Sequence, residues 1–204
     1  MEASAAIFLD KDGTLIPDIP YNVVPERITL NEHVAESLYE LQKKFKLIVV
    51  SNQAGVAKGL FAMEDLQGVQ NKMISLFQEY QVKIDGFYFC PHYPSGKIER
   101  YAKVCNCRKP KPGMLMEAAR THNIDLSQSW MIGDILNDVQ AGKSVGCKAI
   151  LIYNGNETEW DLQSSEHRVP DYIAADFGAA TAFINRFESG FHPHSDIELN
   201  KNLF

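Results

Sequence analysis

Two aspartates follow a short apolar segment near the start of the chain. Residues 7–9 are apolar, and Asp10 and Asp12 come directly after them, one residue apart, before a glycine and a threonine. Residues two apart on an extended backbone point to the same side, so these carboxylates repel each other unless a cation lies between them. The alternative is an ordinary turn, because aspartate and glycine are common turn residues. Ligands of α/β sheets bind where parallel strands end, and this position favours chemistry.

Polar residues also end two later apolar segments. Ser51 comes directly after one of them, and Asp134 ends another. A serine hydroxyl can bind a phosphate oxygen, although an ordinary transition from strand to loop is the alternative for Ser51 alone. Parallel strands bring their carboxyl ends to one edge of a sheet, and carboxylates gathered there suit Mg²⁺, which prefers oxygen ligands. We therefore expect a Mg²⁺ site formed by Asp10, Asp12 and Asp134.

Arranged around one cation, these residues support phosphoryl transfer. We expect Asp10 to act as the nucleophile and form an aspartyl-phosphate, while Asp12 protonates the leaving alkoxide and then activates water. Ser51 and Lys109 would bind the phosphoryl oxygens, where positioning and electrostatics do most of the catalytic work. Asp138 lies near the start of a predicted helix, so it either reaches the waters on Mg²⁺ or simply favours the helix N-terminus.

Cysteine and histidine residues form a second group. Cys90 and His92 are followed, after twelve residues, by Cys105 and Cys107. Three thiols and one imidazole are a common ligand set for a structural zinc site, and the intervening loop has little apolar core of its own. A chance cysteine together with a redox pair at the two later positions is the alternative. Cys147 is expected to be a buried thiol.

Two irregular segments are placed to line the site. Arg108 and Lys109 directly follow the last cysteine, so bound zinc would hold both cations in place, whereas a solvated basic run is the alternative. Residues 16–22 contain two prolines and follow the acidic pair, which predicts a loop. Tyr21 in that loop is either a substrate contact or a packing aromatic.

Apolar segments alternate with segments of helical periodicity, which predicts an α/β fold with a parallel sheet covered by helices on both faces. We expect one domain, residues 1–188, and a polar C-terminal tail, residues 189–204. Asn31 is the expected N-cap of the first helix. Strands are expected at residues 7–9, 45–50, 86–90, 129–134, 147–152 and 172–174. Helices are expected at residues 33–44, 63–81, 112–122, 136–145 and 178–187.

Composition and charge narrow the class of protein. The chain has 204 residues and a net charge of −6, which argues against a nucleic-acid-binding protein. It has no apolar stretch of about 18 residues that would predict a membrane span. Its first residues do not resemble a signal peptide. We expect a cytoplasmic, monomeric protein with neither nucleic acid nor membrane as a partner.

The complete set of motifs resembles the haloacid dehalogenase superfamily of phosphatases. Residues 10–14 read Asp-Lys-Asp-Gly-Thr and look like its first motif. Ser51, Lys109 and the pair Asp134 and Asp138 look like the second, third and fourth motifs, in that order. The resemblance implies a Rossmann-like parallel sheet and a Mg²⁺-dependent phosphatase.

A finer resemblance is to the heptose 1,7-bisphosphate phosphatase group. That group shares with histidinol phosphatases a Cys-x-His…Cys-x-Cys zinc loop that runs into Arg-Lys-Pro. The resemblance implies removal of the 7-phosphate from D-glycero-D-manno-heptose 1,7-bisphosphate, in the biosynthesis of nucleotide-activated heptose, by an enzyme with no large cap domain. The substrate-binding residues that it implies are Asp18, Tyr21, Asn52 and Arg108.

Three other functions are alternatives. A histidinol-phosphate phosphatase is less favoured, because the chain has no second catalytic domain of a bifunctional enzyme. A 3′-end polynucleotide phosphatase conflicts with the acidic composition. A non-catalytic zinc-binding interaction module would not need Asp10, Asp12, Ser51, Lys109 and Asp134 together.

Overall fold

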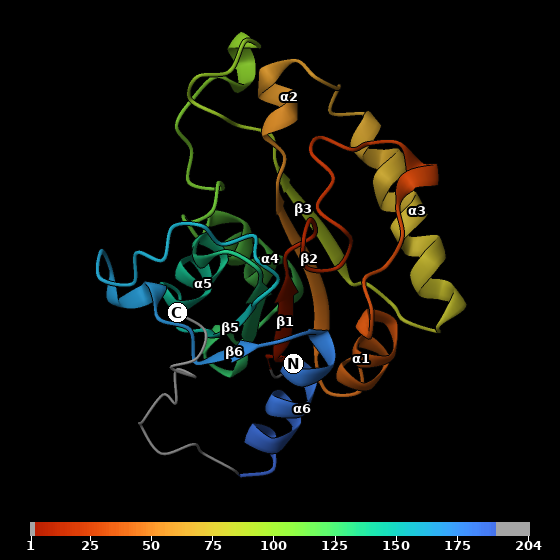
Figure 1. Ribbon diagram of the computed structural model, residues 1–204, viewed down its shortest axis with the longest axis vertical. Helices are drawn as coiled ribbons and strands as arrows, with labels where there is room; N and C mark the ends of the chain where they lie inside the picture. Colours follow the sequence, from red (N-terminus) through yellow and green to blue (C-terminus); the bar gives the residue numbers. More distant parts are fainter. Residues whose placement is uncertain (1–2, 191–204) are drawn as a thin grey trace.

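The computed structural model describes residues 3–190, which form a six-stranded sheet between two layers of helices (Figure 1). All neighbouring strands are parallel, in the order β3-β2-β1-β4-β5-β6. The strands are β1 (Ala6–Leu9), β2 (Lys46–Asn52), β3 (Gly86–Cys90), β4 (Trp130–Gly133), β5 (Lys148–Ile152) and β6 (Tyr172–Ala174). The α-helices are α1 (Val34–Leu41), α2 (Ala54–Lys58), α3 (Asp65–Glu79), α4 (Gly113–His122), α5 (Leu136–Lys143) and α6 (Phe177–Glu188). Short 3₁₀ helices cover Pro25–Arg27, Glu99–Tyr101, Leu126–Gln128 and Glu166–Arg168.

Each face of the sheet packs against its own set of helices. Ile7 and Leu9 of β1 lie in a core with apolar side chains of α1, α3 and α6. Phe8, which points to the opposite face, packs in a second core with side chains of α4 and α5. Because β1 is buried on both faces, all four of its residues are apolar rather than alternating. The predicted α/β architecture is confirmed.

The strand order places the site at the middle of the sheet. The chain moves outward from β1 in one direction through β2 and β3, and in the other through β4, β5 and β6. This order creates a crevice between the carboxyl ends of β1 and β4, where ligands of such sheets bind. Asp10 follows β1 and Asp134 follows β4, so the topology brings these two carboxylates to the crevice.

Two local expectations were wrong or incomplete. Asn31 does not cap α1. His33 occupies the N-cap with a positive φ of 61°, and Asn31 instead donates its amide to the carbonyls of Gly13 and Thr14. The side chain of Asn31 therefore binds loop carbonyls instead of capping the helix. The short helix α2 was not predicted, because its five residues are too few for a periodic pattern.

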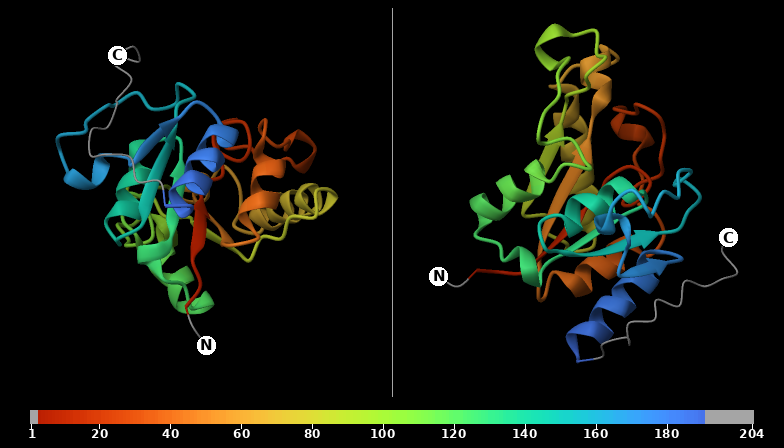
Figure 2. Two further views of the ribbon diagram at one scale, coloured as in Figure 1. Left: turned by 90° about the horizontal axis from the view of Figure 1, so that it is seen from below. Right: turned by 90° about the vertical axis from the view of Figure 1, so that its left-hand side faces the viewer.

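No cap domain is inserted between residues 3 and 190. Instead, the loop after β3 and the helix α2 extend together beyond the carboxyl end of the sheet, side by side in Figure 1 and in the right-hand view of Figure 2. Among the helices of the described residues, none has the length and apolarity that crossing a membrane requires. The predicted tail lies outside the described residues from position 191 onward.

Candidate active site

Three buried carboxylates meet where β1 and β4 end. Asp10, Asp134 and Asp138 each offer an oxygen, and these oxygens all lie within 4.8 Å of one another. None of the three residues is more than 8% exposed. Burial raises the pKa of Asp10 to about 7, against the opposing effect of Lys109, and burial also raises the pKa of Asp134 to about 6. In the folded protein, burial therefore disfavours the ionised forms of Asp10 and Asp134.

One buried cation lies among them. The Nζ atom of Lys109 contacts Asp10, lies 2.6 Å from Asp138 and donates to the carbonyl of Val50 at 2.8 Å. Burial opposes the charge of Lys109, but the two carboxylates outweigh burial and raise its pKa. When all three carboxylates are ionised, one ammonium leaves two negative charges unbalanced. An oxygen-lined site with this residual charge fits Mg²⁺.

Asp138 lies beside Asp10 and Asp134, and its contact with the waters on Mg²⁺ remains a prediction. Its Oδ2 atom accepts a hydrogen bond from the backbone N–H of Ile135 at 3.3 Å, at the start of α5. The helix N-terminus thus holds Asp138 in place.

Asp12 lies to one side of this cluster. Its two carboxylate oxygens accept hydrogen bonds from Lys11 Nζ at 2.5 Å and from Gln53 Nε2 at 2.9 Å. Gln53 also donates to Ser51 Oγ at 2.8 Å, so it links the predicted acid–base residue to the predicted phosphate-binding hydroxyl. The coordination of Mg²⁺ by Asp12 remains a prediction. Sequence reasoning gave Gln53 no role, although its position directly after β2 and two residues after Ser51 was the available signal.

The turn after β1 fits closely around Asp134. Gly13 has a φ of +84°, and a Cβ atom at this position would overlap Asp134 Oδ2. Thr14 donates to the other oxygen, Asp134 Oδ1, at 3.3 Å. Asn154 and Asn156, in the loop after β5, donate to Asp134 Oδ2 at 3.4 and 2.6 Å. Neither asparagine was expected in the site, because nothing in their local sequence distinguishes them from ordinary loop residues.

Asn52 holds the backbone of Lys109. Its Oδ1 atom accepts from Lys109 N at 3.0 Å, and its Nδ2 atom donates to Lys109 O at 3.1 Å. These two hydrogen bonds join the end of β2 to the loop that carries the cation, 57 residues further along the chain. In this structure the amide of Asn52 is therefore occupied by the protein backbone, and its predicted contact with substrate stays a prediction.

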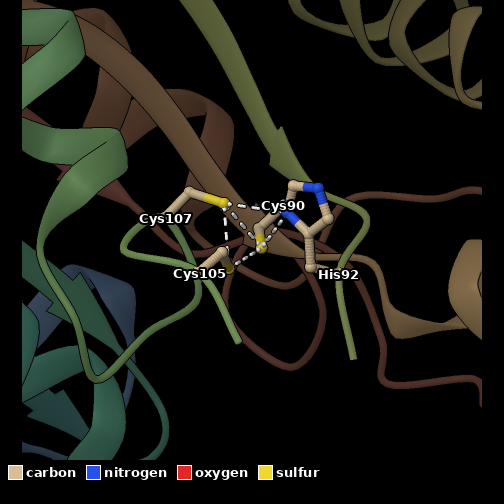
Figure 3. Close-up of side chains that lie close together, drawn as sticks. All are labelled: Cys90, His92, Cys105 and Cys107. Atoms are coloured by element: carbon tan, nitrogen blue, oxygen red, sulfur yellow. Dashed lines mark hydrogen bonds between the residues drawn. The ribbon is translucent and has the colours of Figure 1, made fainter. Parts of the chain in front are cut away.

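The four predicted zinc ligands gather at the end of β3 (Figure 3). The Sγ atom of Cys107 lies 3.0 Å from that of Cys90 and 3.2 Å from that of Cys105. His92 Nδ1 lies 3.2 Å from Cys107 Sγ. Three thiols and one imidazole around a common centre form the donor set of a structural zinc site, so these residues fit that metal.

Cations and aromatic rings surround one side of the crevice. Lys58, at the end of α2, donates to Tyr21 Oη at 2.5 Å and lies 4.8 Å from the centre of the Tyr93 ring. Arg108 lies over the same ring at 5.3 Å, and its Nη1 atom is buried without a hydrogen-bond partner. Burying a guanidinium nitrogen in this way is unfavourable until an acceptor arrives. This side of the site is suited to an anion.

Asp18 lines a cavity that does not include Lys58, Tyr93 or Arg108. This cavity has a volume of about 340 Å³ and is also lined by Thr14 and two further acidic residues, Glu32 and Asp176. The two predicted contacts from the proline-containing loop, Asp18 and Tyr21, are thus directed to different surroundings, one acidic and one basic. Both roles in substrate binding remain predictions.

Known proteins share this sequence and this fold. The HAD-hydrolase-like family model matches residues 106–180. The chain is 42% identical, over 153 residues, to D-glycero-beta-D-manno-heptose-1,7-bisphosphate 7-phosphatase of Haemophilus ducreyi, covering 74% of this chain and 84% of that protein. It is 38% identical over 170 residues to the Escherichia coli K12 protein of the same name, covering 78% of this chain and 88% of that protein.

A solved structure extends the similarity to the fold. The D,D-heptose 1,7-bisphosphate phosphatase of B. bronchiseptica, determined with magnesium and phosphate, aligns with a TM-score of 0.75 and 27% identity. The alignment covers 90% of this chain and 99% of that one. Together with the arrangement of Asp10, Lys109 and Asp134, these similarities establish the family. The chain belongs to the haloacid dehalogenase-like hydrolases, in the family of the heptose-bisphosphate 7-phosphatases, and is a phosphoric monoester hydrolase.

Proposed function

We propose that the protein is a Mg²⁺-dependent phosphatase that removes the 7-phosphate of D-glycero-D-manno-heptose 1,7-bisphosphate through an aspartyl-phosphate intermediate. The observation that carries the proposal is the buried cluster of Asp10, Asp134 and Asp138 around Lys109. The names of the relatives support the choice of substrate. Mg²⁺ bound by the carboxylates would neutralise charge between the nucleophile and the phosphate.

The proposed hydrolysis has two steps, formation and breakdown of the aspartyl-phosphate. In the first, a carboxylate oxygen of Asp10 bonds to phosphorus, the bond from phosphorus to the sugar oxygen breaks, and protonated Asp12 gives its proton to that oxygen. In the second, water gives a proton to Asp12 and attacks the same phosphorus, which releases phosphate and restores Asp10. The hydrogen bonds from Lys11 and Gln53 hold the carboxylate of Asp12 in one orientation for both proton transfers.

Ser51 and Lys109 serve the phosphoryl group. Because Gln53 donates to Ser51 Oγ, the hydroxyl hydrogen of Ser51 is left to donate to a phosphoryl oxygen. Lys109 supplies a fixed positive charge beside Asp10, and it needs no reorganisation when charge develops on the phosphoryl oxygens.

The basic side of the crevice supports a substrate with a second phosphate. Lys58 and Arg108 share the Tyr93 ring, and among the described residues neither forms an ion pair with a carboxylate. A phosphate bound here would supply the acceptor that Arg108 Nη1 lacks. A bisphosphate would then be held at both ends.

A steady-state comparison of substrates tests the proposal. We expect the highest kcat/KM for heptose 1,7-bisphosphate, with release of the 7-phosphate, and much lower values for heptose 7-phosphate and histidinol phosphate. A large preference for histidinol phosphate would overturn the heptose assignment.

We further propose that zinc at Cys90, His92, Cys105 and Cys107 is structural and that the protein is a cytoplasmic monomer in nucleotide-activated heptose biosynthesis. The closed set of four protein ligands supports the role of zinc. The net charge of −6 supports the absence of a nucleic-acid partner. Elemental analysis and light scattering of the purified protein test the metal content and the monomer.

A further inference from the structure

The loop after β5 contacts one of the clustered carboxylates, Asp134, and the turn after β1. Asn154 Nδ2 donates to the carbonyl of Gly13 at 2.8 Å and to Asp134 Oδ2 at 3.4 Å. Asn156 Nδ2 donates to the same Asp134 oxygen at 2.6 Å. One carboxylate oxygen thus receives two amide donors from a single loop.

The loop is itself anchored. Asn154 Oδ1 accepts from the backbone N–H of Asn156 at 3.0 Å, which fixes the two asparagines relative to each other. Glu157 Oε2 accepts from the backbone N–H of Leu136 at 2.6 Å, at the first residue of α5. The same helix carries Asp138, so the loop is tied to the turn after β1 and to the helix that supplies another carboxylate.

These contacts restrict how Asp134 can turn. Asp134 is 4% exposed. Its Oδ1 atom accepts a hydrogen bond from Thr14 at 3.3 Å, which is longer than the 2.6 Å hydrogen bond from Asn156 to Oδ2. The short hydrogen bond at Oδ2 therefore sets the plane of the carboxylate. Groups that orient a metal ligand in this way raise the affinity of the site, because the ligand does not have to be ordered when the metal binds.

We propose that Asn154 and Asn156 are positioning residues that orient Asp134 and thereby set the affinity of the protein for Mg²⁺. The proposal rests on the Mg²⁺ dependence in the proposed function, but not on the identity of the sugar. Loss of the Asn156 amide should weaken Mg²⁺ binding by about 10- to 100-fold, the effect usual for groups that orient metal ligands. Loss of the Asn154 amide should have a smaller effect on affinity, because its hydrogen bond to Asp134 is longer.

Calorimetric titration of the full-length protein with MgCl₂ tests this inference without a substrate. The variants are Asn156→Ala, Asn154→Ala and Asn156→Gln, and Asn71→Ala on α3 is the matched control. We expect a weaker Kd for both alanine variants, partial recovery in Asn156→Gln because it retains the amide, and an unchanged Kd in the control.

Kinetics separate this role from a general loss of structure. In Asn156→Ala, kcat should fall at limiting Mg²⁺ and return to within a few fold of the unaltered enzyme when Mg²⁺ is saturating. A Kd for Mg²⁺ in Asn154→Ala and Asn156→Ala within twofold of the unaltered protein would overturn the inference. The substrate comparison tests the heptose assignment separately, since a wrong sugar leaves the Mg²⁺ titration unchanged.

Discussion

The side chain of Asn52 forms two hydrogen bonds with the backbone of Lys109: it accepts from the N–H group at 3.0 Å and donates to the carbonyl at 3.1 Å. The ammonium group reaches Asp10 and Asp138 only if that backbone stays in place. We therefore expect any contribution of Asn52 to catalysis to be made through Lys109.

Replacing Asn52 should slow the chemical step. We expect Asn52→Ala to lower kcat by about 100-fold, the effect of displacing a catalytic group by about 1 Å, with little change in KM. Steady-state kinetics on the bisphosphate measure both constants. If Asn52 instead binds substrate directly, KM will rise and kcat will stay near its original value.

Asp10→Asn should abolish hydrolysis while preserving the fold. The amide is not a nucleophile, and Lys109 keeps Asp138 as a partner. Because one of three buried carboxylates is removed, the metal-free variant should also unfold at a higher temperature than the metal-free parent. Intact-mass analysis should show a phosphorylated intermediate in the parent alone. Hydrolysis at the original rate would refute the nucleophile assignment.

The stability of the metal-free protein should depend on pH in a defined direction. Burial raises the pKa of Asp10 to about 7 and that of Asp134 to about 6, well above the value of 3.8 for an unburied aspartate. The folded state therefore binds protons that the unfolded chain has released, and the stabilisation that they provide is lost as pH rises through 6 to 7.

Thermal unfolding in a metal chelator between pH 5.5 and 8 measures this dependence, and Tm should fall as pH rises. Asp10→Asn is the control, because it removes one of the two groups and should reduce the slope. Saturating Mg²⁺ should oppose the trend, since it binds the ionised carboxylates. A Tm that rises with pH in the chelator would contradict the raised pKa values.

The basic side of the crevice should distinguish bisphosphates from monophosphates. We expect Lys58→Met to raise KM for the bisphosphate about tenfold or more, since a hydrogen bond to a charged group contributes about 1.5–3 kcal/mol. The kinetics of heptose 7-phosphate should change little. Lys43→Met, on the exposed surface after α1, is the matched control. Equal effects on both substrates would place Lys58 outside the second-phosphate site.

Removal of zinc should weaken substrate binding as well as the fold. The backbone N–H groups of Lys97 and Ile98, in the loop between the two ligand pairs, both donate to the carbonyl of Ala57, at 2.7 and 2.9 Å. Ala57 directly precedes Lys58, and Arg108 directly follows the last zinc ligand. We expect a chelator of zinc to lower Tm and to raise KM for the bisphosphate.

Thiol labelling at pH 8 provides an independent measure of the metal. After chelation, Cys105 and Cys107, which are partly exposed, should react with iodoacetamide. Cys147 should stay unlabelled in the folded protein, because it is buried and burial raises its pKa to about 12. Labelling of Cys105 and Cys107 at equal rates with and without the chelator would show that no metal protects them.

The parts of the site that could be predicted from the sequence are those fixed by local pattern. Asp10 and Asp134 each end an apolar strand, and the rule that such strand ends meet is sufficient to pair them. Gln53 and Asn156 reach Asp12 and Asp134 only through the tertiary arrangement of loops, and no periodicity marks them. Asn31 was misassigned for the same reason, since the loop carbonyls that it serves are distant in sequence from α1.

The hydrogen bonds from the cysteine-containing loop to Ala57 make this loop and α2 one unit, separate from the end of the sheet. The sheet end holds the carboxylates and Lys109, whereas α2 and the loop hold Lys58 and Tyr93, the side that we propose binds the second phosphate. For protein engineering, we therefore expect substitutions within residues 93–104 to change the preference among substrates more than they change the chemical step.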